Sequence, residues 1–143
     1  MNINIKRINP FAIIPKKSSD GAAGFDLFNC EKDVELLTGD NHLFKIGFII
    51  EIPENFVGYI YARSGLGCKN GIIPRNCVGV IDSDYRGEIM VCLQNNGTEK
   101  YTIHTNDKIA QLIISEIPNV QLVIKESLTE TKRGMGGFGS TGI

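Results

Sequence analysis

The chain has 143 residues, of which 42% are hydrophobic and 22% are charged. This length and composition fit one ordinary globular domain with a sizeable core, and no second core is required. With 15 basic residues against 16 acidic ones, the formal net charge is -1, which argues against a nucleic-acid interface and against a polybasic membrane surface. An anionic ligand must therefore be held by local geometry rather than by a global positive field.

The cysteines and the start of the chain indicate the compartment. Cys30, Cys68, Cys77 and Cys92 form no CxxC pair, which favours free thiols in a reducing compartment over a structural zinc site. The first ten residues contain no apolar signal core, and no apolar stretch is long enough to cross a bilayer. We therefore expect a soluble intracellular protein of the cytoplasm or nucleus, with no membrane and no nucleic acid among its partners.

Short apolar runs rich in Ile, Val, Phe and Tyr recur along the chain between Gly, Asn, Asp and Pro residues. Strands are predicted at residues 3–8, 43–52, 57–62, 79–81, 88–93, 101–105, 108–114 and 120–125. Turn signals stand at residues 53–55, 69–71, 95–97 and 106–107. Almost no segment has a helical pattern. Many short strands at this spacing favour an all-β sandwich or barrel of the jelly-roll kind.

Two segments in the first half carry groups suited to binding ions. Asp26 stands among apolar residues, where a lone carboxylate is usually a turn or surface group but can also orient a hydrated divalent cation. Arg63, Ser64 and Gly65 follow an apolar strand, and they can present a guanidinium, a hydroxyl and a close backbone amide to one anion. The alternative for this second segment is an ordinary loop with an exposed Arg.

The segment 79–87 is more informative. It begins like a buried strand and then places two carboxylates, Tyr85 and a base within a turn-sized stretch. A carboxylate beside apolar walls is a candidate general base, and an adjacent aromatic ring can pack on a sugar and exclude an extra hydroxyl. The alternative is a β-hairpin with a solvated turn. Further on, Gln111 lies in an aliphatic strand, and a buried Gln needs hydrogen-bond partners from the protein or from a ligand.

The last segment, residues 133–142, is half glycine. Glycine raises the cost of ordering and leaves little to bury, so the segment cannot form a core strand on its own. Composition favours a disordered tail, as at most glycine-rich termini. The alternative is an arm that orders over a ligand, with amides for phosphate, Phe138 for a flat ring and Arg133 for charge.

Taken together, five segments resemble the homotrimeric dUTP pyrophosphatases, or dUTPases. The family's five ordered motifs are matched at residues 22–27, 62–66, 79–87, 106–113 and 133–142, in order and over nearly the whole chain. The resemblance implies an all-β fold, a distorted jelly-roll subunit of a homotrimer with a flexible glycine-rich C-terminal arm. Residues 1–132 would form the jelly-roll domain, and the arm, residues 133–143, would close over an active site at a subunit interface.

The resemblance also implies cleavage of dUTP to dUMP and pyrophosphate with Mg²⁺, which keeps uracil out of DNA and supplies dUMP for thymidylate synthesis. Asp82 matches the general base that activates water for attack on the α-phosphorus, and Tyr85 matches the aromatic that backs deoxyribose and rejects a 2′-hydroxyl. Residues matched to uracil contacts are Asn76, Gly79, Val80, Ile81 and Phe138, and Met90 matches a position that lines the pocket. Residues matched to phosphate contacts are Arg63, Ser64, Gly65, Arg133, Gly139 and Ser140. Asp26 and Gln111 match groups that contact the metal and phosphates through water only, so Mg²⁺ would be held mainly by the substrate phosphates.

Two alternatives stay open beside this hypothesis. A dCTP deaminase of similar fold would need a different catalytic constellation, and the intact segment around Asp82 and Tyr85 speaks against it. A nucleotide-switched binding protein of the same fold would leave no fixed motif. One departure from the family pattern is Asn106 in place of the usual glycine; Asn tolerates a left-handed backbone, so we expect the turn to survive.

Overall fold

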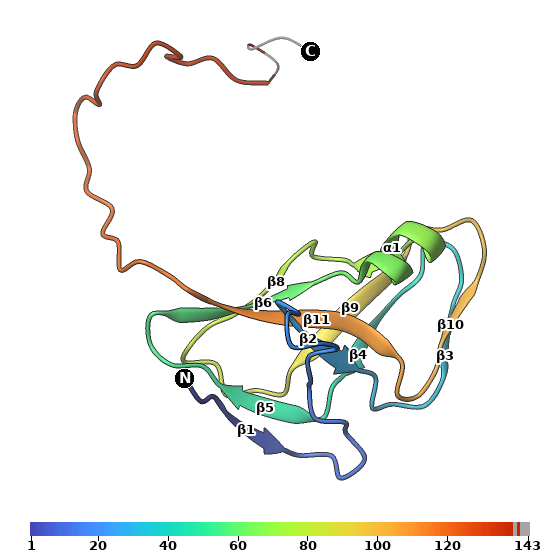
Figure 1. Cartoon of the computed structure of the whole chain (residues 1–143). Coiled ribbons are helices and arrows are strands. Elements are labelled where there is room, and N and C mark those ends of the chain that lie inside the picture. The colour runs from blue at the N-terminus through green and yellow to red at the C-terminus, as the bar shows by residue number, and fades with distance from the viewer. Residues whose placement is uncertain (139, 141–143) are drawn as a thin grey trace.

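The computed structural model describes residues 1–138 and 140, and it is built almost entirely from strands (Figure 1). The elements are β1 (Asn4–Arg7), β2 (Phe25–Phe28), β3 (Val34–Leu36), β4 (Asn41–Lys45), β5 (Phe48–Glu51), β6 (Phe56–Tyr61), α1 (Ser64–Asn70), β7 (Ile72–Pro74), β8 (Gly79–Ile81), β9 (Met90–Asn95), β10 (Tyr101–Ile103) and β11 (Lys108–Glu116). The described part of the chain contains no helix long and apolar enough to span a bilayer.

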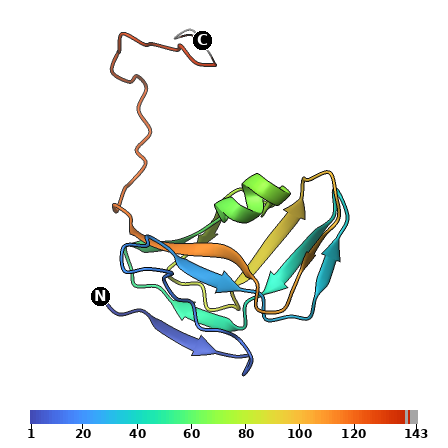
Figure 2. The same cartoon turned by 45° about the vertical axis from the view of Figure 1, so that its right-hand side comes forward.

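Antiparallel pairing joins the strands into two larger and two smaller sheets. One sheet has the order β2-β11-β6-β8, and the other has the order β4-β9-β7. Strand β1 pairs with β5, and β3 pairs with β10. Figures 1 and 2 show the C-terminal segment leaving the body after β11 in both views.

The hydrophobic core joins the two larger sheets. One buried cluster contains Leu27, Ile60 and Leu112 from the first sheet together with Phe44 and Leu93 from the second. Buried side chains along β9 alternate with exposed or half-buried ones, as expected for a strand with one face on a core. The all-β prediction is therefore confirmed.

The predicted strand at residues 43–52 is two strands, because the chain turns at Gly47. This residue has a φ of +80°, and a Cβ built on it would lie 2.5 Å from the Cβ of Ala12 and 2.9 Å from that of Asn9. Glycine is thus required both by backbone conformation and by space. The Gly47 N–H donates to Oε1 of Glu88 at 3.0 Å, which ties the junction of β4 and β5 to the segment before β9.

Other differences from the predicted elements concern short or unpaired segments. Strands β2, β3 and β7 and helix α1 lie outside the predicted strands. The strand predicted at residues 120–125 is wrong: the segment has no strand, and Leu122 and Ile124 are each 99% exposed. A strand needs a neighbouring edge to pair with, and this segment has already left the sheets.

Candidate active site

Five of the predicted site residues line one pocket of about 290 Å³, which we call the Asp26 pocket. They are Asp26, Arg63, Ser64, Gly65 and Gln111. Strand pairing explains why residues so distant in sequence meet here. Gln111 on β11 lies opposite Asp26 on β2 and opposite Tyr61 on β6, and the chain runs from Tyr61 directly into Arg63.

The amide of Gln111 has the partner that a half-buried amide requires. Its Nε2 donates to the carbonyl oxygen of Ala62 at 2.8 Å, at the end of β6. Gly24 packs against the same side chain, since a Cβ on Gly24 would lie 3.2 Å from Oε1 of Gln111. Gln111 on β11 therefore bonds to the chain just after β6 and also lines the pocket. Its amide has the hydrogen-bond partner that a Gln in an aliphatic strand was expected to need.

Asp26 is a buried carboxylate surrounded by donors. Its Oδ1 lies 3.3 Å from Nε of Arg63, its Oδ2 lies 2.8 Å from Nζ of Lys108, and the hydroxyl of Ser18 also donates to Oδ2. Burial disfavours the charged form, but the hydrogen bonds from Lys108 and Ser18 and the charges of Lys108 and Arg63 outweigh it, so the pKa of Asp26 is lowered from 3.8. The pocket lining therefore includes one fixed anion, Asp26, and one cation, Arg63, and a second cation, Lys108, contacts the same anion.

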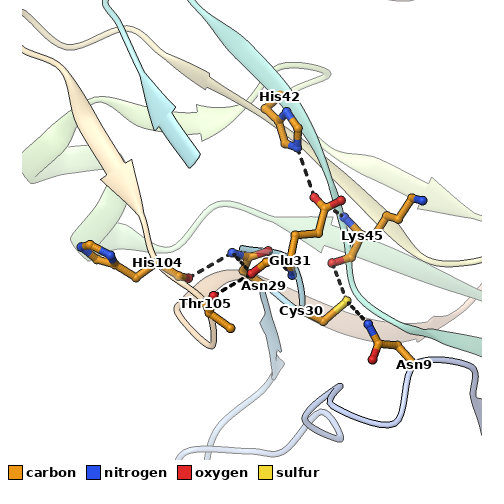
Figure 3. Close-up of polar contacts among 8 residues, drawn as sticks. All are labelled: Asn9, Asn29, Cys30, Glu31, His42, Lys45, His104 and Thr105. Atoms are coloured by element: carbon orange, nitrogen blue, oxygen red, sulfur yellow. Dashed lines mark hydrogen bonds and ion pairs between the residues drawn. The ribbon is translucent and has the colours of Figure 1, made fainter. Parts of the chain in front are cut away.

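The end of β2 is tied to the turn before Lys108 by a buried asparagine (Figure 3). Asn29 is fully buried; its Nδ2 donates to the carbonyl oxygens of His104 at 3.0 Å and Glu31 at 3.3 Å, and its Oδ1 accepts from the N–H of Glu31 at 2.9 Å. All polar atoms of this amide are thus engaged, which is the condition for burying it without a large penalty.

Backbone hydrogen bonds complete the same junction. The N–H of Asn29 donates to the carbonyl of Asp107 at 2.9 Å, and its carbonyl accepts from the N–H of Asn106 at 2.8 Å. Asn106 has a φ of +68°, so the left-handed turn expected at this position is confirmed. Lys108 follows at once, and its carbonyl oxygen accepts from Nη1 of Arg63 at 3.1 Å. The turn thereby fixes Lys108 and, through it, Arg63.

Helix α1 begins directly at the Asp26 pocket. Arg63 is its N-cap residue, with extended backbone angles and no side-chain capping hydrogen bond, and the helix ends at Gly71 with a φ of +70°. The first amides of a helix have no partner within it, so the N–H groups after Arg63 are available to an acceptor in the pocket. A Cβ on Gly65 would meet no atom within 4 Å, so the pocket is open beside this residue. The two glycines in the helix explain why its pattern is not helical in the sequence.

Seven further predicted residues line a second pocket of about 260 Å³, which we call the Asp82 pocket. They are Asn76, Gly79, Val80, Ile81, Asp82, Tyr85 and Met90. Strand β8 pairs with β6, whereas β9 pairs with β4 and β7. Residues 82–87 therefore cross from one sheet to the other, and the alternative of a β-hairpin turn is wrong.

The aromatic ring of Tyr85 is fixed within this crossing. Its N–H donates to the carbonyl of Asp82 at 3.2 Å, and its hydroxyl donates to the carbonyl of Glu88 at 3.0 Å. Asp82 is exposed in the single chain, and Tyr85 is 37% exposed. A carboxylate and an aromatic face thus border one pocket from a single short stretch, as the sequence predicts.

The predicted arm residues lie far from both pockets. Arg133 Nε donates to the carbonyl of Gly136 at 2.8 Å, and the N–H of Ser140 donates to the carbonyl of Gly137 at 3.0 Å. Phe138 is fully exposed, and Gly139 lies outside the described residues. In the described part of the arm, every hydrogen bond runs to another arm residue or to Thr131. The single chain therefore does not bring the fifth motif to the other four.

A model of the dUTPase family matches residues 11–142. The chain belongs to the dUTPase family. Among its relatives, the deoxyuridine 5'-triphosphate nucleotidohydrolase of Alkaliphilus metalliredigens is 44% identical over 142 residues, which cover 99% of this chain and 98% of that protein. The enzyme of the same name from Wolinella succinogenes is also 44% identical, over 99% of this chain and 95% of that protein.

Solved dUTPase structures share the fold. Staphylococcus bacteriophage 80alpha dUTPase with dUPNHPP is 25% identical and superposes with a TM-score of 0.91, covering 99% of both chains. The G164S mutant of that phage enzyme, 24% identical, gives the same TM-score. The predicted jelly-roll fold of the dUTPases is therefore confirmed for this chain.

Sequence reasoning missed two residues at the Asp26 pocket. Ser18 and Lys108 both bond to Asp26, and Lys108 Nζ also donates to the Ser18 hydroxyl at 3.0 Å. Lys108 lies within the fourth dUTPase motif, yet nothing in that segment marks it as a partner of Asp26. The contact arises because β2 pairs with β11, with a register shift between Lys108 and Ala110. This register depends on residues far apart in the sequence, so a local pattern cannot show it.

Proposed function

We propose that the protein hydrolyses dUTP to dUMP and pyrophosphate. The observation that carries this proposal is the sorting of the motif residues into two pockets, one edged by Arg63 and the start of α1, the other by Asp82 and Tyr85. The first suits a chain of phosphates and the second a base with its sugar. Relatives named deoxyuridine 5'-triphosphate nucleotidohydrolase at 44% identity support the same substrate.

In the proposed mechanism Asp82 is the general base. It takes a proton from the water that attacks the α-phosphorus, and the bond from that phosphorus to the bridging oxygen breaks as pyrophosphate leaves. Arg63 and the free amides of Ser64 and Gly65 stabilise the charge on the departing phosphates. Tyr85 backs the deoxyribose and leaves no space for a 2′-hydroxyl.

The donor set of the Asp26 pocket fits Mg²⁺ that is held chiefly by substrate phosphates. Both oxygens of Asp26 already face cations. Over residues 1–138 and 140, no three His, Cys, Asp or Glu side chains gather as a metal site. Asp26 and Gln111 would contact the metal only through its water shell, and the bound ion would neutralise charge on the triphosphate.

We further propose that complete sites form only in a homotrimer. The Asp26 and Asp82 pockets share no lining residue. The arm, residues 133–143, would act as a unit apart from the jelly-roll domain, residues 1–132, and close over a neighbouring subunit's site. Arg133, Gly139 and Ser140 would then contact phosphate, and Phe138 would cover uracil.

The test is incubation with each deoxynucleoside triphosphate and with UTP in the presence of Mg²⁺, with separate measurement of monophosphate, pyrophosphate and ammonia. We expect equal amounts of dUMP and pyrophosphate from dUTP and little turnover of the other nucleotides. Ammonia released from dCTP would identify a deaminase instead. Binding of dUTP without any product would identify a nucleotide-switched binding protein.

A further inference from the structure

Tyr85 does not stand free in the Asp82 pocket but lies against its own following backbone. A Cβ built on Gly87 would lie 2.5 Å from Cζ of the Tyr85 ring and 2.9 Å from Cε2, and still closer to the hydroxyl oxygen. Real Cβ atoms do not approach other heavy atoms this closely. The ring therefore occupies the space that any side chain at position 87 would need.

The reason for glycine at position 87 is space and not backbone freedom. Gly87 is absent from the residues with positive φ, which include Gly47 and Gly71. An alanine could adopt its backbone conformation, and the three atoms nearest to its Cβ would all belong to the side chain of Tyr85. These atoms are at the far end of the Tyr85 side chain, so the ring can move away when a side chain is introduced at position 87.

The partner that holds the ring belongs to a fixed part of the fold. The Glu88 carbonyl, which accepts from the Tyr85 hydroxyl, belongs to a residue whose side chain accepts from the Gly47 N–H at 3.0 Å. The next residue, Ile89, is fully buried; its N–H donates to Phe48 at 3.0 Å and its carbonyl accepts from Ile46 at 3.1 Å. The acceptor for Tyr85 therefore cannot follow a displaced ring.

The side chain of Arg86 also holds the backbone of the loop between Asp82 and Gly87. Its Nη1 donates to the carbonyl of Ser83 at 2.7 Å and to that of Tyr85 at 2.9 Å, and its Nη2 lies 3.6 Å from Glu51. Because the main chain is held at both ends, the side chain of Tyr85 is the part that must move when position 87 is filled.

From these contacts we propose that Gly87 is a positioning residue for sugar selection: its bare backbone seats the Tyr85 ring, and the ring sets the discrimination between dUTP and UTP. This inference rests on the proposed function, because it explains how Tyr85, the residue proposed to pack on deoxyribose, is held in position. Gly87 itself touches no substrate and acts only through Tyr85. A side chain at 87 is expected to lift the ring off Glu88 and open the sugar position.

The experiment compares the ratio of kcat/KM for dUTP over UTP in the full chain and in Gly87→Ala. We expect the ratio to fall about tenfold, while the far-ultraviolet circular dichroism and the midpoint of thermal unfolding stay near those of the parent. Gly21→Ala is the matched control, since a Cβ there would meet nothing within 4 Å and should leave the ratio unchanged.

A double-mutant cycle separates action through Tyr85 from a general effect on the pocket. If Gly87 works by seating the ring, Gly87→Ala should have no further effect on the ratio in the Tyr85→Ala background. An unchanged ratio in Gly87→Ala, or an equal loss in both backgrounds, would overturn the proposal.

A second readout does not depend on turnover and so distinguishes this inference from the proposed function. The chain has four tyrosines and no tryptophan, and Tyr85→Phe assigns the ring resonances of Tyr85 in tyrosine-labelled protein. Gly87→Ala should shift these resonances, and Gly21→Ala should not. Unmoved resonances would refute the seating of Tyr85 even in an active dUTPase. Shifted resonances in a protein without dUTP turnover would uphold the seating and reject the proposed function.

Discussion

Lys108 and Arg63 meet on opposite oxygens of one carboxylate, Asp26: Nζ of Lys108 lies 2.8 Å from Oδ2, and Nε of Arg63 lies 3.3 Å from Oδ1. Lys108 begins β11, Arg63 precedes α1 as its N-cap residue, and Asp26 lies in β2. A buried anion thus sets the spacing of two cations, of which Arg63 lines the pocket that we assign to phosphates.

Replacing Asp26 with Asn is expected to impair both catalysis and stability. Arg63 and Lys108 would lose the anion that orients them, which should lower kcat/KM for dUTP about 100-fold. Loss of one partner of a buried ion pair should also cost about 3 kcal/mol of unfolding free energy at neutral pH. Steady-state kinetics and urea unfolding measure the two effects, and Glu99→Gln, an exposed carboxylate, is the matched control.

The stability part of this effect should depend on pH. The folded-state pKa of Asp26 is lowered from 3.8, so its contribution is fully present above 3.8 and is lost as pH falls through the folded value. The difference in unfolding free energy between the parent and Asp26→Asn should therefore shrink in acid. A constant difference down to strongly acidic pH would contradict the assignment.

Asp82→Asn should separate chemistry from binding. Turnover should fall about 1,000-fold because the general base is gone, while affinity for a non-hydrolysable dUTP analogue changes little. Asp84→Asn provides a control within the same stretch, since Asp84 is absent from the Asp82 pocket. Pyrophosphate release and calorimetric titration measure the two quantities, and near-normal turnover in Asp82→Asn would remove it from the base role.

Ending the chain at Lys132 should leave the fold intact and cripple catalysis. The hydrogen bonds of the described arm residues reach no further into the body than Thr131, so thermal unfolding and the size of the assembly in gel filtration should match those of the full chain. Pyrophosphate release should fall by about two orders of magnitude or more, because the arm is expected to close the site. Full activity of the shortened chain would exclude a role for Arg133 and Phe138.

Asn29→Ala should lower the unfolding free energy by about 2–3 kcal/mol, because it removes the buried amide that bonds to the carbonyl of His104 and to the N–H of Glu31. The exposed Asn119→Ala serves as its control, and chemical denaturation gives the values. Since the turn held by Asn29 precedes Lys108, whose carbonyl oxygen accepts from Arg63, KM for dUTP should rise as well. A stable variant would show that backbone hydrogen bonds alone hold this junction.

The pair of His104 and Asp33 predicts a pH window. Nδ1 of His104 lies 2.7 Å from Oδ2 of Asp33, and the hydrogen bond between them raises the pKa of His104 above 6.5 and lowers that of Asp33 below 3.8. The His104 contribution is present below 6.5 and lost as pH rises through its folded value; the Asp33 contribution is present above 3.8 and lost as pH falls through its own. The pair therefore stabilises the fold most between 3.8 and 6.5, so His104→Gln should lower the midpoint of thermal unfolding within this window and should remove the loss of stability that the pair causes as pH rises above it.

Much of the site can be predicted from sequence because its residues lie in short motifs. Asp82 and Tyr85 share one stretch, and their common pocket follows from local chain geometry. The same is not true of Lys108 or Ser18, whose meeting with Asp26 depends on the register of β2 against β11. Local patterns also miss α1, since its glycines disfavour a helix, and they misread residues 120–125, whose apolar pattern lacks an edge to pair with in the single chain.

The separation of the Asp26 pocket from the Asp82 pocket has a genetic consequence. If each site draws one pocket from one subunit and the second from its neighbour, a mixed trimer of two defective alleles contains some interfaces with both pockets intact. Co-expression of Asp82→Asn with Arg63→Ala chains should then restore part of the activity that each allele lacks alone. Conversely, an allele defective in one pocket should damage one site per chain and so only its share of the sites, whereas an allele defective in both pockets should damage up to two sites per chain and so behave as partly dominant.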